Sequence, residues 1–297
     1  MNRRDFLRSV AGTGFYLVAR SLFPDQSFQK YDVGIAKGTS RERTVEEAIN
    51  LVGGIRTFVK PGDVVSVKPN IGFNSPPALK ANTDPVVVRT VVHLCFQALA
   101  SKVYVFDRAA NNPRLTYVSS GIAEAAEQAG AKVLYVNDVT KRMYRTISIP
   151  GAQVLKNVSV NRYALESDVF INLPVAKVHS SAGLTIALKN LMGVTGDNRS
   201  KWHWNLHQSI SDFSLGVKTH LTVVDATSIM IKNGPTGGRL EYLKRLDTIV
   251  ASADIVSADA ATAELFGIDP SRIGYMALAH EKGIGALKGY TVGRVAV

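Results

Sequence analysis

The densest group of side chains that could do chemistry lies near the middle of the chain. Residues 172–179 read as a strand that runs into a loop bearing Lys177 and His179, and the helix expected after it carries Lys189 and Asn190 near its end. Two ammonium groups and an imidazole within one strand–loop–helix unit could bind a small anion. The simpler explanation for Lys189 is a cation that stabilises the last turn of its helix.

These groups indicate acid–base chemistry on a bound anion. An imidazole titrates near neutral pH, so His179 could act as a general acid or base, oriented by Asp225 or Asp107. The predicted catalytic set is His179, Lys189 and Asp225, with Lys189 also binding the anion. The other predicted ligand-binding residues are lysines, amides and glycines: Lys68, Asn70, Lys177, Asn190, Gly234 and Gly237.

Polar side chains follow several predicted strands at the point where each strand ends. They are Lys68 and Asn70, Asp107 and Arg108, the segment 177–179, and Asp225. In an open parallel sheet, ligands bind beyond the carboxyl ends of the strands. Any one of these residues could be a solvated loop residue or a helix cap. Their convergence at one edge of the sheet is what favours a site.

Two histidines between tryptophans form a separate candidate, a metal site. In Trp202-His203-Trp204-Asn205-Leu206-His207, His203 and His207 would share one face of a helix, a spacing that can chelate a metal ion. The glutamate of the HExxH motif is absent, which excludes a zinc protease. A structural or substrate-stacking role for the two histidines is the alternative.

A glycine-rich loop follows the strand that ends at Asp225. Gly234-Pro235-Thr236-Gly237-Gly238 would let a ligand approach the backbone closely and would expose amide groups to it. A tight turn needs the same residues. The segment lacks the lysine of a P-loop and does not open a GxGxxG helix.

Strand-like and helical runs alternate from Tyr31 onward, which predicts an α/β fold. Strands are expected at 32–36, 64–68, 102–106, 132–136, 168–173 and 221–224, and helices at 44–52, 85–99 with Thr83 as the cap, 121–129, 255–266 and 272–282. This order is typical of a mainly parallel sheet with flanking helices. Residues 143–160 predict a small inserted β-hairpin. We expect a single domain, 29–297, with 140–165 as a candidate subdomain.

Composition limits the classes of function. The net charge is +11 over 297 residues, but the basic residues are scattered, which argues against a nucleic-acid tail and is compatible with steering small anions. Cys95 is the one cysteine, so the chain can form neither an internal disulfide nor a cluster ligated by four of its own cysteines. No cysteine-ligated iron–sulfur cluster is expected, and any other cofactor is left unidentified.

The first residues predict export. Asn2-Arg3-Arg4-Asp5-Phe6-Leu7-Arg8 reads as a twin-arginine targeting signal, and the apolar stretch after it is far shorter than the roughly 20 residues of a spanning helix. We expect residues 1–28 to send the folded protein to the periplasm or another extracytoplasmic space through the twin-arginine translocation machinery. This segment would be its only contact with a membrane. The alternative is an amphipathic N-terminal helix of the mature domain.

Several short blocks, in this order, resemble the family named domain of unknown function 362. The blocks are Val67-Lys68-Pro69-Asn70, the strand from Asp168 to Pro174, Lys177-Val178-His179, Ala187-Leu188-Lys189-Asn190-Leu191-Met192-Gly193, Val223-Val224-Asp225-Ala226, Gly234-Pro235, and Ala253-Asp254 to Asp259-Ala260. The activity of this family is not generally established. Many members carry a ferredoxin-like module with cysteine-ligated clusters, which this sequence is expected to lack. The order of His179, Lys189 and a later His203 or His207 is also similar to that in lactate-racemase-type enzymes.

Three hypotheses follow from these observations. The first is an exported protein that binds a small anionic ligand, and acts as an enzyme through lysine, histidine and aspartate. The second is a non-catalytic periplasmic binding or accessory protein for a cofactor or metal. The third, more remote, is a racemase or isomerase of the lactate-racemase kind. Nucleic-acid binding rests on net charge alone and is discounted.

Overall fold

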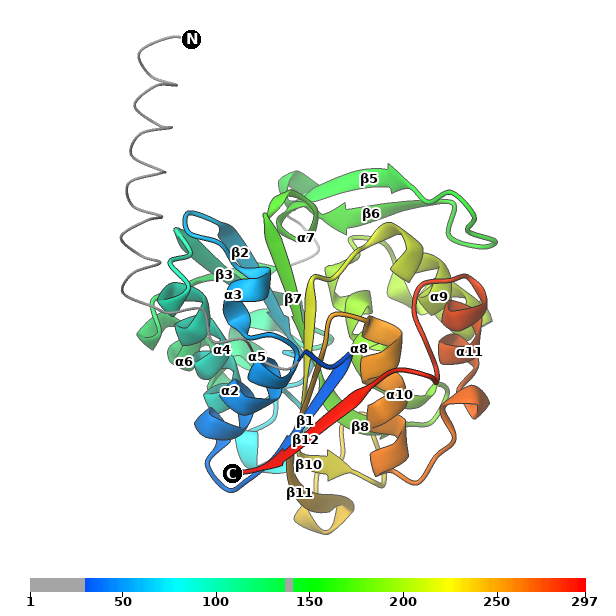
Figure 1. The fold of residues 1–297 in the computed structure, drawn as a ribbon. Coiled ribbons are helices and arrows are strands. Elements are labelled where there is room, and N and C mark those ends of the chain that lie inside the picture. Colours follow the sequence, from blue (N-terminus) through cyan, green and yellow to red (C-terminus); the bar gives the residue numbers. More distant parts are fainter. Residues whose placement is uncertain (1–29, 137–140) are drawn as a thin grey trace, which may run out of the picture.

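The computed structural model describes residues 30–136 and 141–297, so the predicted signal segment lies outside the described residues. One large sheet runs through the middle of the molecule, with helices on both sides (Figure 1). Its main strands are ordered β12-β1-β11-β10-β7-β2-β3-β4, and β8 and β9 extend it beside β10. The bounds are β1 Val33–Lys37, β2 Val64–Pro69, β3 Lys102–Arg108, β4 Lys132–Val136, β7 Val169–Leu173, β8 Val175–His179, β9 Gly183–Thr185, β10 Leu221–Met230, β11 Leu243–Ser252 and β12 Val292–Ala296.

The centre of the sheet is parallel, as the alternation of strands and helices predicts. The neighbouring pairs β10–β7, β7–β2, β2–β3 and β3–β4 are all parallel, whereas β11 runs antiparallel to both β1 and β10. The predicted α/β fold with a mainly parallel sheet and flanking helices is therefore confirmed. This arrangement places the carboxyl ends of β2, β3 and β7 at one edge.

Two hydrophobic cores cover the two faces of the sheet. Helices α2 to α6 lie on one side and α8 to α11 on the other (Figure 1). The bounds are α2 Arg41–Leu51, α3 Ile55–Phe58, α4 Pro85–Gln97, α5 Pro113–Ser119, α6 Ile122–Gln128, α7 Arg162–Glu166, α8 Ala187–Asn190, α9 Leu206–Gly216, α10 Ile255–Leu265 and α11 Gly274–Glu281. Strand β2 shows how alternate side chains of one strand point to opposite faces of the sheet. Val65 and Val67 pack into the core that α2 to α6 cover. Its intervening Ser66 and Lys68 are also fully buried, and alternation points them to the other face.

The predicted hairpin forms a sheet of its own. Strands β5 Tyr144–Ser148 and β6 Asn157–Asn161 pair antiparallel and join no strand of the large sheet. Asp212 of α9 holds the turn between them, because its Oδ2 accepts hydrogen bonds from the amides of Val154 and Leu155 at 2.6 and 3.1 Å. The hairpin is thus tied to the helical layer rather than inserted between parallel strands.

Several element boundaries differ from those expected. Helix α2 begins at Arg41 because the Ser40 hydroxyl accepts from the amide of Arg43. Thr83 does not cap α4; the cap is Asp84, which accepts from Val86, while the Thr83 hydroxyl donates to the carbonyl of Leu173. Helix α5, which begins at a proline, was not predicted.

The segment expected to be a loop is a strand. Lys177 and His179 lie on β8, which pairs with β10 and β9. In place of the helix expected to carry Lys189 and Asn190 near its end, the chain forms β9, the one-turn helix α8 and the 3-10 turn η3 Leu191–Val194. The other 3-10 turns are η1 Pro77–Leu79, η2 Lys141–Met143, η4 Arg199–Asn205, η5 Leu240–Tyr242 and η6 Pro270–Arg272. Within the described ranges no helix has the length and apolarity needed to span a bilayer.

Candidate functional site

One pocket of about 350 Å³ gathers most of the predicted site residues at the carboxyl ends of β2 and β3. The predicted residues that line it are Lys68, Asn70, Lys177, His179, Lys189, Asn190 and His203. Arg108, Arg199 and Asp107 join them, so five of the described lining side chains are basic and Asp107 is the one acid. The expected convergence of polar groups at this edge is therefore present, and its charge is strongly positive.

Lys68 belongs to the framework of the pocket. Its Nζ forms an ion pair with Asp107 Oδ1 at 2.7 Å and donates to Asn190 Oδ1 and the carbonyl of Pro69, both at 2.9 Å. An ammonium group has three hydrogens, so these three partners use all of them. Lys68 therefore joins β2, β3 and α8 and has no donor left for a ligand.

Gly193 is required by the ion pair between Lys68 and Asp107. A Cβ at this position would lie 1.9 Å from Asp107 Oδ1 and 2.7 Å from Lys68 Nζ. We predict that Gly193→Ala lowers the free energy of unfolding by about 2 kcal/mol, because two buried side chains must separate. Gly72→Ala is the matched control on the same pocket, since its Cβ would meet only Asn70, at 3.6 Å. Urea denaturation showing equal stability for both variants would contradict this view of Gly193.

Lys177 is an ammonium that has, among the described residues, two hydrogen-bond partners and no carboxylate partner. Its Nζ donates to the carbonyl of Ala81 at 2.6 Å and to Asn70 Oδ1 at 3.2 Å, and it lies 4.8 Å from the centre of the Phe73 ring. Burial and the nearby charge of Lys189 lower the pKa of Lys177 to about 7. One of its three hydrogens remains for a ligand.

Lys189 of α8 has fewer hydrogen-bond acceptors around its amine than Lys177 has, among the described residues. Its Nζ contacts the Met192 sulfur at 3.7 Å, and no described carboxylate lies within ion-pair distance. A thioether is a weak acceptor. Burial and the charge of Arg199 lower the pKa of Lys189 to about 8. Lys177 and Lys189 are therefore cations that a bound anion would stabilise.

His179 has a fixed orientation, and no carboxylate of residues 30–136 or 141–297 is hydrogen-bonded to it. Its Nδ1 accepts hydrogen bonds from the amides of Ser181 and Ala182 at 3.1 and 3.3 Å, so the neutral ring carries its proton on Nε2. Burial and the charge of Lys189 lower the pKa of His179 to about 4. At neutral pH this histidine is thus a hydrogen-bond donor, and the general-base role expected from its ordinary pKa is not favoured.

We predict that His179 stays neutral, in the Nε2–H form, from pH 8 down to about pH 5.5. The amide bonds to Nδ1 and the surrounding cations both oppose protonation. Nitrogen-15 NMR of the labelled imidazole distinguishes the two tautomers and the charged ring. The same signal in urea should titrate near its ordinary value, and a folded-state midpoint near pH 6.5 would refute the assignment.

The amides of the pocket form a connected network. Asn190 Oδ1 accepts from Asn70 Nδ2 at 3.2 Å, and Asn190 Nδ2 donates to Asn172 Oδ1 at 2.8 Å. Asp259 of α10 fixes the start of α8, accepting from the amides of Ala187 and Leu188 at 2.6 and 3.1 Å. Burial raises the pKa of Asp259 to about 8, despite these two bonds. The network holds the helix that presents Lys189.

Asp225 lies outside the pocket, contrary to its expected catalytic role. Its carboxylate accepts from the amide of Asp84 at 2.9 Å and from the hydroxyl of Thr227 at 2.6 Å. It therefore fixes the start of α4 and does not orient His179. Asp107 does not orient His179 either, since its two oxygens hold Lys68 and, at 2.7 Å, the amide of Ile71.

The glycine-rich loop meets the pocket through a different residue. Pro235 lines it, whereas Gly234 and Gly237 do not. A Cβ on Gly234 would lie 2.0 Å from the carbonyl oxygen of Val178, so this glycine lets the loop lie against β8. Gly234 thus has a packing role, and the structure places neither glycine on the wall of this pocket.

His203 and His207 do not share a helix face. Asn205, the last residue of η4, has an extended φ of −145° and separates the two elements, so His203 belongs to η4 and His207 to α9. His207 Nδ1 accepts from the amide of Tyr275 at 3.0 Å, while the His203 ring faces that of His179 with centroids 6.4 Å apart. The predicted shared helix face, which suggested a metal site, is therefore absent from the structure. In the described parts of the chain no group of three or more His, Cys, Asp or Glu side chains is placed to hold a metal ion.

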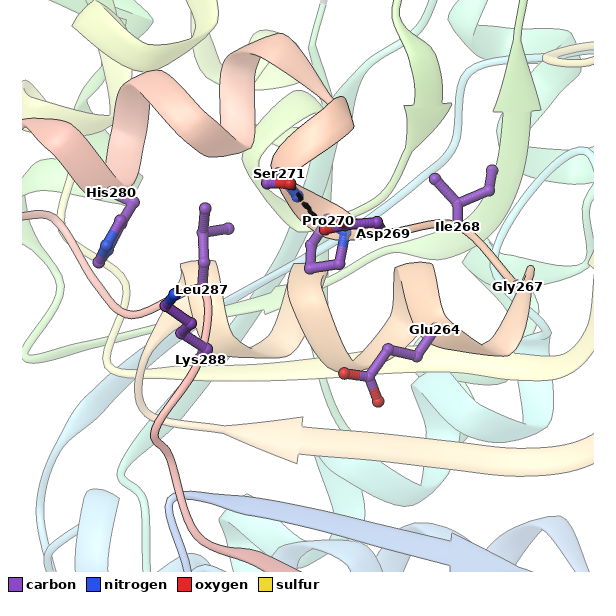
Figure 2. Close-up of a pocket in the computed structure, with 9 residues that line it drawn as sticks. All are labelled: Glu264, Gly267, Ile268, Asp269, Pro270, Ser271, His280, Leu287 and Lys288. Carbon is purple, nitrogen blue, oxygen red and sulfur yellow. Dashed lines mark hydrogen bonds between the residues drawn. The ribbon is translucent and has the colours of Figure 1, made fainter.

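A larger pocket of about 720 Å³ lies between α10, η6 and α11 (Figure 2). Its side chains include Glu264, Asp269, His280 and Lys288, and none of the predicted site residues lines it. Asp269 already accepts from the amide and hydroxyl of Ser271. The smaller pocket is the better candidate for a ligand-binding site. It gathers buried charged groups, and the free-energy cost of burying them is typical of functional sites.

Comparisons with known proteins found a matching family, a similar protein and similar solved structures. The family described as "Domain of unknown function (DUF362)" matches residues 65–264. A thylakoid-associated protein of Synechocystis sp. is 26% identical over 265 residues, which cover 86% of this chain and 78% of that protein. The lactate racemase apoprotein from Thermoanaerobacterium thermosaccharolyticum matches 82% of this chain with a TM-score of 0.50 and 11% identity, and the chain spans 58% of that structure. A protein from Thermotoga maritima matches 76% of this chain, over 59% of its own length, with a TM-score of 0.46 and 11% identity.

The structural match to the lactate racemase shows a shared α/β fold. At 11% sequence identity it says nothing about the reaction. The family match is more informative, because residues 65–264 include every side chain that lines the smaller pocket. The resemblance seen in the sequence blocks is confirmed, and the chain belongs to the DUF362 family.

Proposed function

We propose that the protein binds a small anion, a carboxylate or a phosphate, in the pocket between β2, β8 and α8. The observation that carries this proposal is the pair Lys177 and Lys189, one buried and one half-buried ammonium group without a carboxylate partner in the part of the chain that the structure describes. Burying an unpaired charge is costly, and an anion between the two would offset that cost. The His179 Nε2–H adds a neutral donor to the same wall.

Calorimetric titration with phosphate and with L-lactate tests the proposal. We expect one of these anions to bind, and Lys189→Gln to weaken its binding about tenfold or more, because the substitution keeps a polar side chain but removes the charge. Lys132→Gln, at an exposed lysine of β4, is the matched control and should bind as the wild type does. Binding that is unchanged in Lys189→Gln would place the anion elsewhere.

Acid–base catalysis on the bound anion is the second candidate. It is favoured by Lys189, which is partly unprotonated at neutral pH and lines the same pocket as His203. The fold shared with lactate racemase makes 2-hydroxy acids the first compounds to try. Loss of the Cα proton signal of L-lactate in deuterated water, followed by NMR, would support an enzyme. Tight binding with no exchange would support the accessory role instead.

We also propose that the protein is exported in its folded state. The proposal rests on Arg3 and Arg4 and on the apolar stretch after them. Replacing both arginines by lysine should leave the protein in the cytoplasm, because the translocation machinery reads the arginine pair. Fractionation that finds the double variant outside the cytoplasm would refute the export route.

A further inference from the structure

Lys189 differs from the other two lysines of the pocket in what surrounds its amine. Lys68 has three strong partners, and Lys177 is held by a carbonyl at 2.6 Å and by Asn70. Both side chains are fully buried. Lys189 is half-buried, lines the cavity and contacts only a thioether among described acceptors. Its nitrogen is therefore the one of the three whose described contacts include no hydrogen bond to oxygen.

The charges around Lys189 favour the neutral amine. The Arg199 guanidinium and the burial of the side chain lower its pKa to about 8. At pH 7 about one tenth of the molecules then carry an uncharged amine, against a few in ten thousand for an ordinary lysine. A neutral amine in a pocket with other cations is the usual setting of a lysine that attacks a carbonyl carbon.

The remaining walls suit a carbonyl compound that also carries a carboxylate. Lys177 has one hydrogen left for an anionic oxygen, and the His179 Nε2–H can donate to a neutral one. A cavity of about 350 Å³ admits a molecule of a few carbon atoms. The pocket thus offers an anion site, a neutral donor and an amine within one enclosure.

We propose that Lys189 forms a reversible imine with a small 2-oxo acid bound in this pocket. The proposal rests on the anion binding proposed above. The lone pair of the neutral Nζ attacks the carbonyl carbon and forms a C–N bond, and a proton moves from nitrogen to oxygen to give a carbinolamine. The hydroxyl then takes a proton from the solvent and leaves as water. The product is an iminium, and no atom is oxidised or reduced.

Trapping with sodium borohydride tests the imine. The full-length protein is mixed with pyruvate and borohydride, which reduces an imine to a stable secondary amine, and is then measured by intact and peptide mass spectrometry. We expect one adduct, on the peptide that contains Lys189. Lys189→Arg should form no adduct, and Lys132→Arg, the exposed control, should form as much as the wild type. L-lactate, which has the carboxylate but no carbonyl, should protect Lys189.

Three outcomes would overturn the imine: no adduct, an adduct that persists in Lys189→Arg, or labelling spread evenly over exposed lysines. Calorimetry with L-lactate separates this failure from that of the proposed function. Lactate binding without an adduct would remove the imine and leave anion binding intact. An adduct on Lys189 without lactate binding or protection would keep the reactive lysine but contradict the anion site. The unfolding midpoint of Lys189→Arg shows whether the variant is folded.

Discussion

Asp212→Asn should lower the free energy of unfolding by about 3 kcal/mol, the largest stability effect that we expect from one substitution. Asp212 is fully buried and pairs with Lys282 of the segment after α11 at 2.5 Å. It also accepts from Gln208 at 2.9 Å and from the two amides of the hairpin turn. Asparagine keeps the shape but leaves the Lys282 ammonium half-buried and without its counter-charge.

The matched control is Glu166→Gln, which breaks the exposed pairs of Glu166 with Arg162 and Arg145. Surface pairs contribute about 0–1 kcal/mol, so this variant should unfold close to the wild type in urea. Equal losses in the two variants would contradict the role given to Asp212.

The effect of Asp212→Asn should depend on pH. Burial raises the pKa of Asp212, but the hydrogen bonds from Lys282 and from the amides of Val154 and Leu155 outweigh it and bring the pKa to about 2. A carboxyl group with a lowered pKa in the folded state stabilises the protein above its ordinary value near 4 and loses that contribution as the pH falls toward 2. The difference between wild type and Asp212→Asn should therefore shrink below about pH 4.

L-lactate affinity should fall by about tenfold or more between pH 6.5 and pH 9. Lactate stays an anion over this range, so the change reports the protein. Lys177 and Lys189 have pKa values of about 7 and about 8 in the free protein. A bound anion favours their ammonium forms, so binding must take up the protons that high pH has removed.

The variant Lys189→Gln sharpens this prediction. With one titrating lysine removed, affinity should be lower at pH 6.5 and should fall less steeply toward pH 9. Lys132→Gln should reproduce the wild-type slope. An affinity that does not change with pH in the wild type would mean that the two lysines do not contact the ligand.

The sequence was sufficient to predict features that depend on local pattern. Alternating strands and helices predict the parallel sheet, and the rule that ligands bind beyond strand ends leads to Lys68, Asn70 and Lys177. Local pattern predicts a loop for Lys177 and His179, yet pairing with β10 and β9 makes this segment a strand of the sheet. Pairing with strands distant in the sequence therefore determines the secondary structure of this segment.

Long-range partners could not be predicted in this way. Asp225 was expected in the site, but an amide 141 residues away takes up its carboxylate. Asp259 fixes α8 from 72 positions further along the chain, and only the folded packing of α10 shows it. The sequence did not predict that Arg199 lines the pocket, because this residue follows no predicted strand. The prediction that His203 and His207 share a helix face is wrong because the backbone of one residue between them, Asn205, is extended.

The most direct test of the anion site is the number of protons taken up when L-lactate binds. Calorimetry at pH 8 in two buffers with different ionisation enthalpies measures that number independently of the affinity. The lysine pair predicts an uptake of about one proton, reduced in Lys189→Gln, since both amines are partly neutral in the free protein. Binding with no uptake, or with release of protons, would contradict a site built on Lys177 and Lys189.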